Sequence, residues 1–179
     1  MKVGAIIQAR LTSSRFPKKI LAKIDGKPVI QWCVENVLKA KEIYGVIVAS
    51  PHKLPIKLPV RVFIGNEKDV LKRYYDCATK YKFDIIVRIT ADCPFIDPKI
   101  IDLAVKYYKS HKYEYVCFAP VDGLDVEVFS YALLARANFN AHAPYEREHV
   151  TPYMRMITKL SVDTAEDLER ARRWYELHG

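Results

Sequence analysis

The sequence of 179 residues lacks several features that assign a protein to a class at once. It contains no run of about 18 apolar residues, so we expect no membrane-spanning helix and no membrane partner. The N-terminal segment MKVGAIIQAR has a short apolar run and no small-residue cleavage site, which predicts a strand rather than a signal peptide. No repeat, low-complexity tract or linker interrupts the chain, so we expect a single domain over residues 1–179.

The cysteines lack any C-x-x-C spacing and lie far apart. There are four of them: Cys33, Cys77, Cys93 and Cys117. Each lies in an apolar stretch, so we expect buried thiols that are reduced. Reduced thiols are typical of a cytoplasmic protein.

Acidic residues are too few to balance the basic ones, and the net charge is +8. A basic chain of this kind raises the hypothesis of a nucleic-acid partner. Most of the lysines, however, lie beside acids in helical segments, which is typical of a solvated surface. We therefore expect no nucleic-acid partner.

Strand and helix patterns alternate along the whole chain. Continuous apolar runs such as residues 2–9 are typical of strands that are buried on both faces. The predicted strands are residues 2–9, 44–50, 60–64, 83–90, 113–119, 124–129 and 159–162, and the predicted helices are residues 28–39, 68–82, 98–110, 130–138 and 164–177. This alternation predicts an α/β fold with a mostly parallel sheet covered by helices on both sides.

The segment RLTSSRFPKKIL follows the first predicted strand and is locally basic. It carries four cations and no acid: Arg10, Arg15, Lys18 and Lys19. The hydroxyls of Ser13 and Ser14 and the backbone amides can donate hydrogen bonds, and Pro17 restricts the shape of the segment. Loops at the carboxyl ends of parallel strands bind ligands, so this segment suits a polyphosphate that supplies the missing negative charge. It matches neither GxxxxGK[ST] nor GxGxxG, and a solvated basic turn is the alternative.

Acids follow two other predicted strands. Asp92 comes shortly after the strand FDIIVRIT, and Asp97 precedes Pro98, a usual start of a helix. We therefore interpret Asp97 as a helix cap and Asp92 as a candidate Mg²⁺ ligand. Asp163 ends the last predicted strand and is a second candidate metal ligand, with a cap or turn residue as the alternative.

Two further segments combine charged residues. Asp125 and Glu127 alternate with apolar residues, so both carboxylates are expected on one face of a strand. That face is either a solvated edge or a surface that binds sugar hydroxyls, because carboxylates accept hydrogen bonds from diols. The segment YEREHVTPY, residues 145–153, is interpreted as a surface cluster of ion pairs.

Several of these segments, in this order, resemble the sugar cytidylyltransferases, the acylneuraminate and 3-deoxy-manno-octulosonate cytidylyltransferase-like enzymes. The basic segment matches the pattern R-x-x-S-x-R-x-P-x-K-x-L and is followed by Gly26-Lys27-Pro28. The strings GNEKDVLKRYYDCA, VRITADCPFIDP, DGLDVEVFS and REHVTPY are most similar to the spore-coat polysaccharide biosynthesis SpsF-type branch. The resemblance covers nearly the whole chain.

The resemblance implies a three-layer, Rossmann-like nucleotidyltransferase fold that binds CTP and Mg²⁺. It implies that the triphosphate is held by Arg10, Ser13, Ser14, Arg15 and Lys19. By the same resemblance, Asp92 and Asp163 hold the metal, and Asp125 and Glu127 face the sugar or sugar acid. Arg73 and Arg88 are secondary contacts or structural partners.

The implied reaction is the attack of a sugar hydroxyl on the α-phosphate of CTP, with release of pyrophosphate. Arg15 and Lys19 are then the catalytic cations that stabilise the charge of the phosphates. Two alternatives are kept: a metal-dependent glycosyltransferase, although a strict DxD motif is absent, and a shortened relative that binds nucleotide without turnover.

The sequence departs from the pattern of the resemblance at two positions and in length. Thr12 and Lys18 stand where glycine is common in the family. Little of the chain separates REHVTPY from the last predicted strand, a region that in relatives often helps to form a dimer. A homodimer is therefore a candidate assembly.

Overall fold

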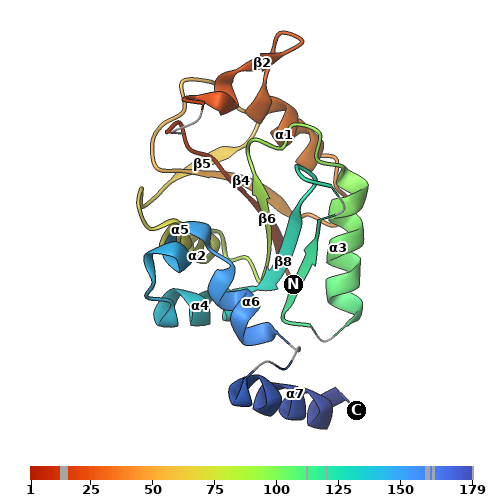
Figure 1. The fold of residues 1–179 in the computed structure, drawn as a ribbon. Coiled ribbons are helices and arrows are strands. Elements are labelled where there is room, and N and C mark those ends of the chain that lie inside the picture. Colours follow the sequence, from red (N-terminus) through yellow and green to blue (C-terminus); the bar gives the residue numbers. More distant parts are fainter. Residues whose placement is uncertain (13–15, 112, 120, 160–161, 163, 179) are drawn as a thin grey trace.

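The structure is a computed structural model that describes the whole chain except residues 13–15, 112, 120, 160–161, 163 and 179 (Figure 1). The strands are β1 (Val3–Gln8), β2 (Lys23–Ile24), β3 (Lys27–Pro28), β4 (Gly45–Ser50), β5 (Arg61–Ile64), β6 (Ile85–Thr90), β7 (Tyr115–Phe118) and β8 (Val126–Ser130). The helices are the short 3₁₀ turn η1 (Lys19–Leu21), α1 (Val29–Val37), α2 (Val70–Tyr81), α3 (Pro98–Ser110), α4 (Tyr131–Asn140), α5 (Pro144–His149), α6 (Pro152–Thr158) and α7 (Ala165–His178).

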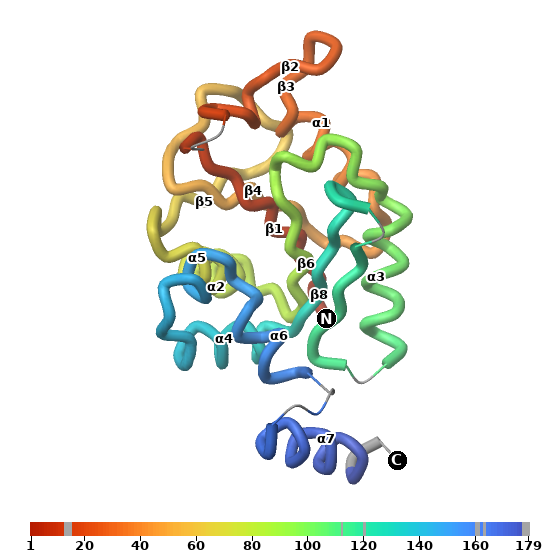
Figure 2. The backbone as a smooth tube through the Cα atoms, viewed as in Figure 1, coloured from red at the N-terminus to blue at the C-terminus, as the bar shows by residue number. Residues whose placement is uncertain are grey.

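A six-stranded sheet with the order β5-β4-β1-β6-β8-β7 forms the middle of the molecule. The strands β5, β4, β1 and β6 are parallel to one another, whereas β8 runs antiparallel to both of its neighbours. The predicted, mostly parallel sheet is therefore confirmed. The hairpin of β2 and β3 projects from the body (Figures 1 and 2).

Helices cover the sheet on both faces, which confirms a three-layer α/β architecture. Alternate residues of β1 point to opposite faces: Ile7 packs in the cluster that contains α1 and α3, and Ile6 packs in the cluster that contains α2 and α4. Both side chains are fully buried. Strands that are apolar on both faces explain why the sequence shows continuous apolar runs rather than alternation.

Capping side chains set the starts of several helices where the sequence indicated. Asp97 accepts a hydrogen bond from the Lys99 amide at 2.8 Å, so its interpretation as a helix cap is confirmed. Ser130 caps α4. Thr164 and Asp167 form the reciprocal hydrogen bonds of a capping box at the start of α7.

The sequence-based prediction is wrong in two places and lacks two short helices. Lys159 and Val162 are not in a strand, and the other two residues of that predicted strand lie outside the described part. The segment around REHVTPY forms α5 and α6, each with proline in its first turn, a start signal that the prediction did not use. Cys117 is exposed on β7, although the other three cysteines are buried as expected and all four are free.

Helix α7 lies beyond the end of α6, at the opposite end of the molecule from the β2–β3 hairpin (Figures 1 and 2). Among the described residues, neither buried apolar cluster of the sheet includes a residue of α7. No helix in the described part of the chain is both long enough and apolar enough to span a membrane.

Candidate functional site

The candidate site lies at the carboxyl ends of β1, β4 and β6, which end side by side. Gln8 at the end of β1 is level with Ala49 of β4 on one side and with Thr90 of β6 on the other. The segments that begin with Arg10 and Asp92 therefore leave adjacent strands at the same edge of the sheet. This is the edge at which ligands bind in parallel α/β sheets.

The basic segment is fixed at its far end by the turn η1. Ile20, the middle residue of that turn, is buried in the α1 side of the core. The amide of Lys18 donates to the carbonyl of Leu11 at 2.9 Å, which closes the loop on itself. Lys18 adopts φ 56°, in the left-handed region that glycine enters without strain, so its backbone fits the glycine common in the family at this position.

The closed loop brings Lys19 against Asp92. The Lys19 Nζ donates to Asp92 Oδ2, and the two side chains are 37% and 35% exposed. Partial burial would raise the pKa of Asp92, but the hydrogen bonds from Lys19 and Thr90 and the charge of Lys19 outweigh it and hold the pKa below its ordinary value. Asp92 is therefore ionised at neutral pH.

Arg10 also has an acidic partner from far along the chain. Its Nη1 lies 3.4 Å from Glu148 Oε1 of α5, and both side chains are about half exposed. In this structure, two acids from elsewhere in the chain, Asp92 and Glu148, pair with two cations of the basic segment. The other three residues implied to hold the triphosphate, Ser13, Ser14 and Arg15, lie outside the described residues.

Asp92 is the carboxylate at this site that could hold a metal. Mg²⁺ takes one or two protein carboxylates and completes its shell with phosphate oxygens and water, so one ionised aspartate beside a phosphate loop fits it. In the described part of the chain, no group of three or more His, Cys, Asp or Glu side chains could hold a metal by itself. Asp163, the second candidate metal ligand, lies outside the described residues.

A cavity of about 270 Å³ adjoins the basic segment. Its lining residues are Arg10, Thr12, Pro51, Glu67, Lys68, Val70, Arg73 and Glu148. Arg73 is 1% exposed, and its guanidinium donates to the backbone carbonyls of Asn66 and Glu67. Burial lowers the pKa of Arg73, and the positive charge of Arg10 lowers it further. Three cations and two carboxylates line this cavity, and the excess of positive charge favours a ligand that carries negative charge or hydrogen-bond acceptors.

Glu127 lies on the same edge of the sheet but is 2% exposed, so it does not form a solvated edge. Its Oε1 accepts hydrogen bonds from Tyr115 at 2.5 Å, Thr151 at 2.9 Å and Arg155 at 2.5 Å. Its Oε2 accepts from Arg88, which also approaches Gln8. Both oxygens of the carboxylate are thus engaged by groups of the chain itself.

The environment of Glu127 favours the ionised form. Burial would raise the pKa of this carboxyl, but the charge of Arg88 and the hydrogen bonds from Tyr115 and Arg155 outweigh the burial and lower the pKa. Asp125 is half-buried and precedes β8. Its negative charge, with that of Asp92, contributes to a raised pKa of the buried Cys93 thiol, for which burial is the larger cause.

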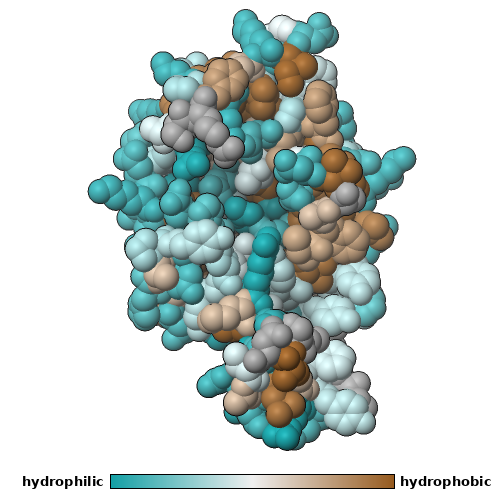
Figure 3. Space-filling model, in the orientation of Figure 1, coloured by the Kyte–Doolittle hydropathy of each residue, from teal (hydrophilic) through white to brown (hydrophobic). Residues whose placement is uncertain are grey.

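Sequence analysis missed the partners that α5 and α6 supply to the site. Glu148 of α5 pairs with Arg10, and Thr151 and Arg155 bind Glu127. These partners lie between 24 and 138 positions away in the sequence, so spacing carried no signal for them. Figure 3, drawn in the orientation of Figure 1, shows hydrophilic side chains gathered across the middle of the face that it presents.

Comparisons with known proteins agree with one another. The chain is 39% identical over 163 residues to an uncharacterised protein of Methanocaldococcus jannaschii, a match that covers 86% of this chain and 67% of that protein. It is 27% identical over 207 residues to the spore coat polysaccharide biosynthesis protein SpsF of Bacillus subtilis, covering 97% of this chain and 86% of that protein. It is 40% identical over 112 residues to the 3-deoxy-manno-octulosonate cytidylyltransferase of Geotalea daltonii, covering 59% of this chain and 44% of that enzyme.

Solved structures give the same result for the fold. A cytidylyltransferase from Leptospira borgpetersenii superposes with a TM-score of 0.80 at 33% identity, over 94% of this chain and 84% of that chain. A CMP:2-keto-3-deoxy-manno-octonic acid synthetase complexed with CTP has a TM-score of 0.69 over 100% of both chains, and its 18% identity supports the fold alone. Both relatives are nucleotidyltransferases, and the fold predicted for this chain, of the Rossmann-like nucleotidyltransferase type, is confirmed.

The family described as Cytidylyltransferase matches residues 4–173, which include both sides of the candidate site. The chain therefore belongs to the cytidylyltransferase family and is an enzyme of the nucleotidyltransferase class.

Proposed function

We propose that this enzyme transfers CMP from CTP to a sugar or sugar acid and releases pyrophosphate, with Mg²⁺ as its cofactor. The observation that carries the proposal is the contact between Lys19 and Asp92 at the carboxyl ends of β1 and β6. A cation for the phosphates and a carboxylate for a metal come from segments 73 positions apart and meet at one point.

The chain contributes binding and charge rather than covalent chemistry. Arg10 and Lys19 bind the triphosphate, and Ser13, Ser14 and Arg15 complete the loop around it. Lys19 and Arg15 stabilise the negative charge that grows on the phosphates while the bond to pyrophosphate breaks. Positioning of the sugar hydroxyl in line with the leaving group accounts for the rest of the acceleration.

Asp92 is the residue that would hold Mg²⁺, and Asp163 is proposed as its second ligand. When bound, this cation supplies positive charge to the phosphate oxygens. The ionised state of Asp92 at neutral pH supports this role, because a protonated carboxyl is a poor ligand.

The acceptor is proposed to bind on the side of Asp125, Arg88 and Glu127. Glu127 is saturated by four donors, so we assign it to holding Arg88 and Arg155 in place rather than to binding the sugar directly. The likeness to SpsF supports a role in the synthesis of a surface polysaccharide or another glycan precursor. A single domain, a cytoplasmic location and a homodimer complete the proposal.

The experiment that tests the proposal measures pyrophosphate release by the purified full-length chain. CTP and MgCl₂ are supplied with a panel of neutral sugars and with 3-deoxy-manno-octulosonate. We expect release that requires CTP together with one of the acceptors, and none with a CDP-sugar or UDP-sugar in place of CTP. Consumption of a nucleotide-sugar without pyrophosphate would instead identify a glycosyltransferase.

Lys19→Ala tests the assigned catalytic cation. We expect turnover to fall by about 10²–10³-fold, because one charged contact to the reacting phosphates is lost. Lys23→Ala is the matched control, since Lys23 is an exposed lysine on β2, and it should retain turnover. Full activity of Lys19→Ala would remove this residue from the reaction.

A further inference from the structure

Helix α5 adjoins the candidate site, yet none of its own residues packs in the apolar core. It spans six residues, and none of them is buried. A short helix without a buried face has little intrinsic stability in water, so polar contacts must fix its position.

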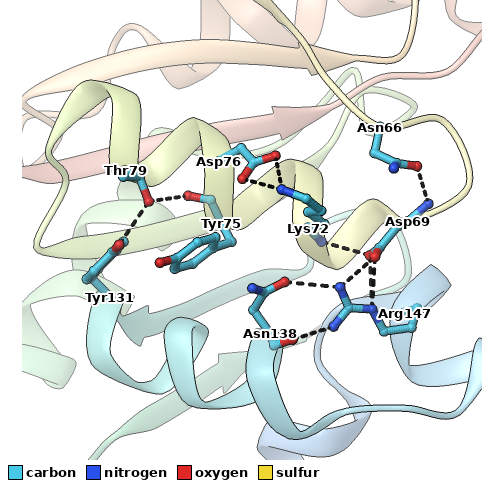
Figure 4. A network of polar contacts seen from close by, with 9 residues as sticks. All are labelled: Asn66, Asp69, Lys72, Tyr75, Asp76, Thr79, Tyr131, Asn138 and Arg147. Carbon is cyan, nitrogen blue, oxygen red and sulfur yellow. Dashed lines mark hydrogen bonds and ion pairs between the residues drawn. The ribbon is translucent and has the colours of Figure 1, made fainter.

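Arg147 supplies those contacts, and Figure 4 shows them from close by. Its Nε lies 3.1 Å from Asp69 Oδ1, and its Nη2 lies 2.5 Å from Asp69 Oδ2, which is a two-pronged ion pair. The same guanidinium donates to the Asn138 carbonyl at 2.6 Å and to Asn138 Oδ1 at 3.0 Å. One side chain thus joins α5 to the start of α2 and to the end of α4. We call this set of contacts the Arg147 clamp.

The Arg147 clamp is attached to a rigid point. Asp69 is the N-cap of α2 and accepts a hydrogen bond from the Lys72 amide at 2.9 Å, while its own amide donates to Asn66 Oδ1 at 2.8 Å. The side chains of Arg147 and Asp69 are 19% and 26% exposed, so the pair is better shielded from water than a surface ion pair.

The far end of α5 is fixed as well, and it is strained. Val150 follows α5 with φ 73°, a left-handed conformation that is costly for a β-branched residue. Its side chain is nevertheless fully buried in the α2 side of the core. Such conformations persist where the surroundings determine them, and they gather at functional sites.

Glu148 and His149 lie between these two fixed points, and Glu148 faces Arg10. The two side chains are 3.4 Å apart and about half exposed, and both line the cavity of about 270 Å³ beside the basic segment. An ion pair of this length and exposure is weak, so a polyphosphate that binds Arg10 displaces it.

We infer that Arg147 is a positioning residue that holds Glu148 as an exchangeable counter-charge for Arg10. The inference rests on the proposed function, which assigns Arg10 to the triphosphate. In this arrangement the affinity for a triphosphate depends on competition with Glu148, and the Arg147 clamp determines how strongly Glu148 competes.

A double-mutant cycle tests the inference, with dissociation constants for CTP and for inorganic tripolyphosphate measured by titration calorimetry. Glu148→Gln removes the competing charge, so we expect both ligands to bind about three- to fivefold tighter, the equivalent of an exposed ion pair. Arg147→Lys keeps the charge but loses the two-pronged contact. It should tighten binding by a smaller factor in the wild-type background, and by none in the Glu148→Gln background.

Arg136→Lys and Glu114→Gln are the matched controls, because these residues form an exposed ion pair between α4 and the segment before β7. Both should leave the two dissociation constants unchanged. A purely structural role for Arg147 predicts lower stability together with unchanged or weaker binding, and it predicts that the two mutations act additively. Either result would overturn the inference, as would unchanged binding in Glu148→Gln.

Tripolyphosphate separates this inference from the proposed function. If the wild-type chain binds tripolyphosphate with the expected pattern but does not bind CTP, the exchange at Arg10 stands and the proposed function fails. If CTP binds and turns over while the cycle is additive, the inference alone fails. Binding of neither ligand rejects both.

Discussion

Glu127 is a single buried carboxylate that balances the charges of two arginines. It lies between Arg88 and Arg155, and no other acid of the chain forms an ion pair with either arginine within the described residues. Removal of one member of a buried ion pair leaves the opposite charge without compensation, which costs far more than the loss of a surface pair.

Glu127→Gln should therefore lower the free energy of unfolding by roughly 3 kcal/mol at pH 7, measured by urea denaturation. Glu114→Gln is the control, because Glu114 pairs with Arg136 where both side chains are about half exposed, and it should change the value by less than about 1 kcal/mol. Equal effects of the two substitutions would contradict the role assigned to Glu127.

The difference in the free energy of unfolding between the wild type and Glu127→Gln has a defined pH dependence. Because folding lowers the pKa of Glu127 from its ordinary value of 4.5, its stabilising contribution is complete above pH 4.5 and is lost as the pH falls through the lower folded value. The difference in stability between the wild type and Glu127→Gln should thus be constant from pH 7 to about pH 5 and should narrow only in more acidic solution. A difference that already narrows near pH 6 would show that this carboxyl has a raised pKa.

At the residue scale, the sequence predicted the charged residues that follow strands better than it predicted their ion-pair partners. Lys19 was identified as one of four cations in a segment without acids, and Asp92 as an acid that follows an apolar strand. Both segments leave parallel strands, which end at one edge of the sheet. Glu148 and Arg155 were not identified, because α5 and α6 place them and these helices have no long apolar stripe. The donors that occupy both carboxylate oxygens of Glu127 are likewise brought together by tertiary packing, and the sequence pattern does not predict them.

At the element scale, paired glycines on β1 and β4 leave a space that an aromatic ring fills. Gly4 and Gly45 are level with one another on these strands, and the ring of Phe83 lies over both. A Cβ added at Gly4 would overlap the ring, whereas a Cβ added at Gly45 would lie 3.5 Å from it, which is an ordinary contact.

Gly4→Ala should therefore destabilise the protein by about 1–3 kcal/mol, because Phe83 has to shift within a packed core. Gly45→Ala, the same substitution on the paired strand, should cost less than about 1 kcal/mol. Thermal or urea unfolding of the two variants, side by side, measures this contrast. If the two substitutions cost the same, the ring does not sit as described.

Elements with strong apolar periodicity were predicted well. The helix over residues 98–110 was predicted with its observed bounds, and the central strands differ by one or two residues at their ends. The strand predicted over 159–162 is wrong at Lys159 and Val162, because a short apolar stretch carries no information about whether a sheet edge is available to it. The 3₁₀ turn at Lys19 and the helices α5 and α6 were too short to show a period.

At the scale of the whole molecule, α7 contributes no described residue to either buried apolar cluster. Leu168 and Tyr175 on this helix are 39% and 71% exposed. A helix that buries little apolar surface contributes little to the free energy of unfolding.

A chain that ends at residue 158 should therefore unfold at nearly the same urea concentration as the full chain, followed by circular dichroism. A large loss of stability would show that α7 is part of the cooperative unit. Turnover of the shortened chain tests the proposed role of Asp163 separately, since normal activity without this residue would exclude it from the metal site.

The ion pairs Lys19–Asp92 and Arg10–Glu148 also have a consequence for product release under the proposed function. Under the proposed function, Lys19 and Arg10 each have a carboxylate partner within the chain, so the release of pyrophosphate leaves neither of these two cations unpaired. A site with the same cations but without these paired acids would bind pyrophosphate more tightly and release it more slowly. The two acids would thus return Lys19 and Arg10 to their paired state after each turnover.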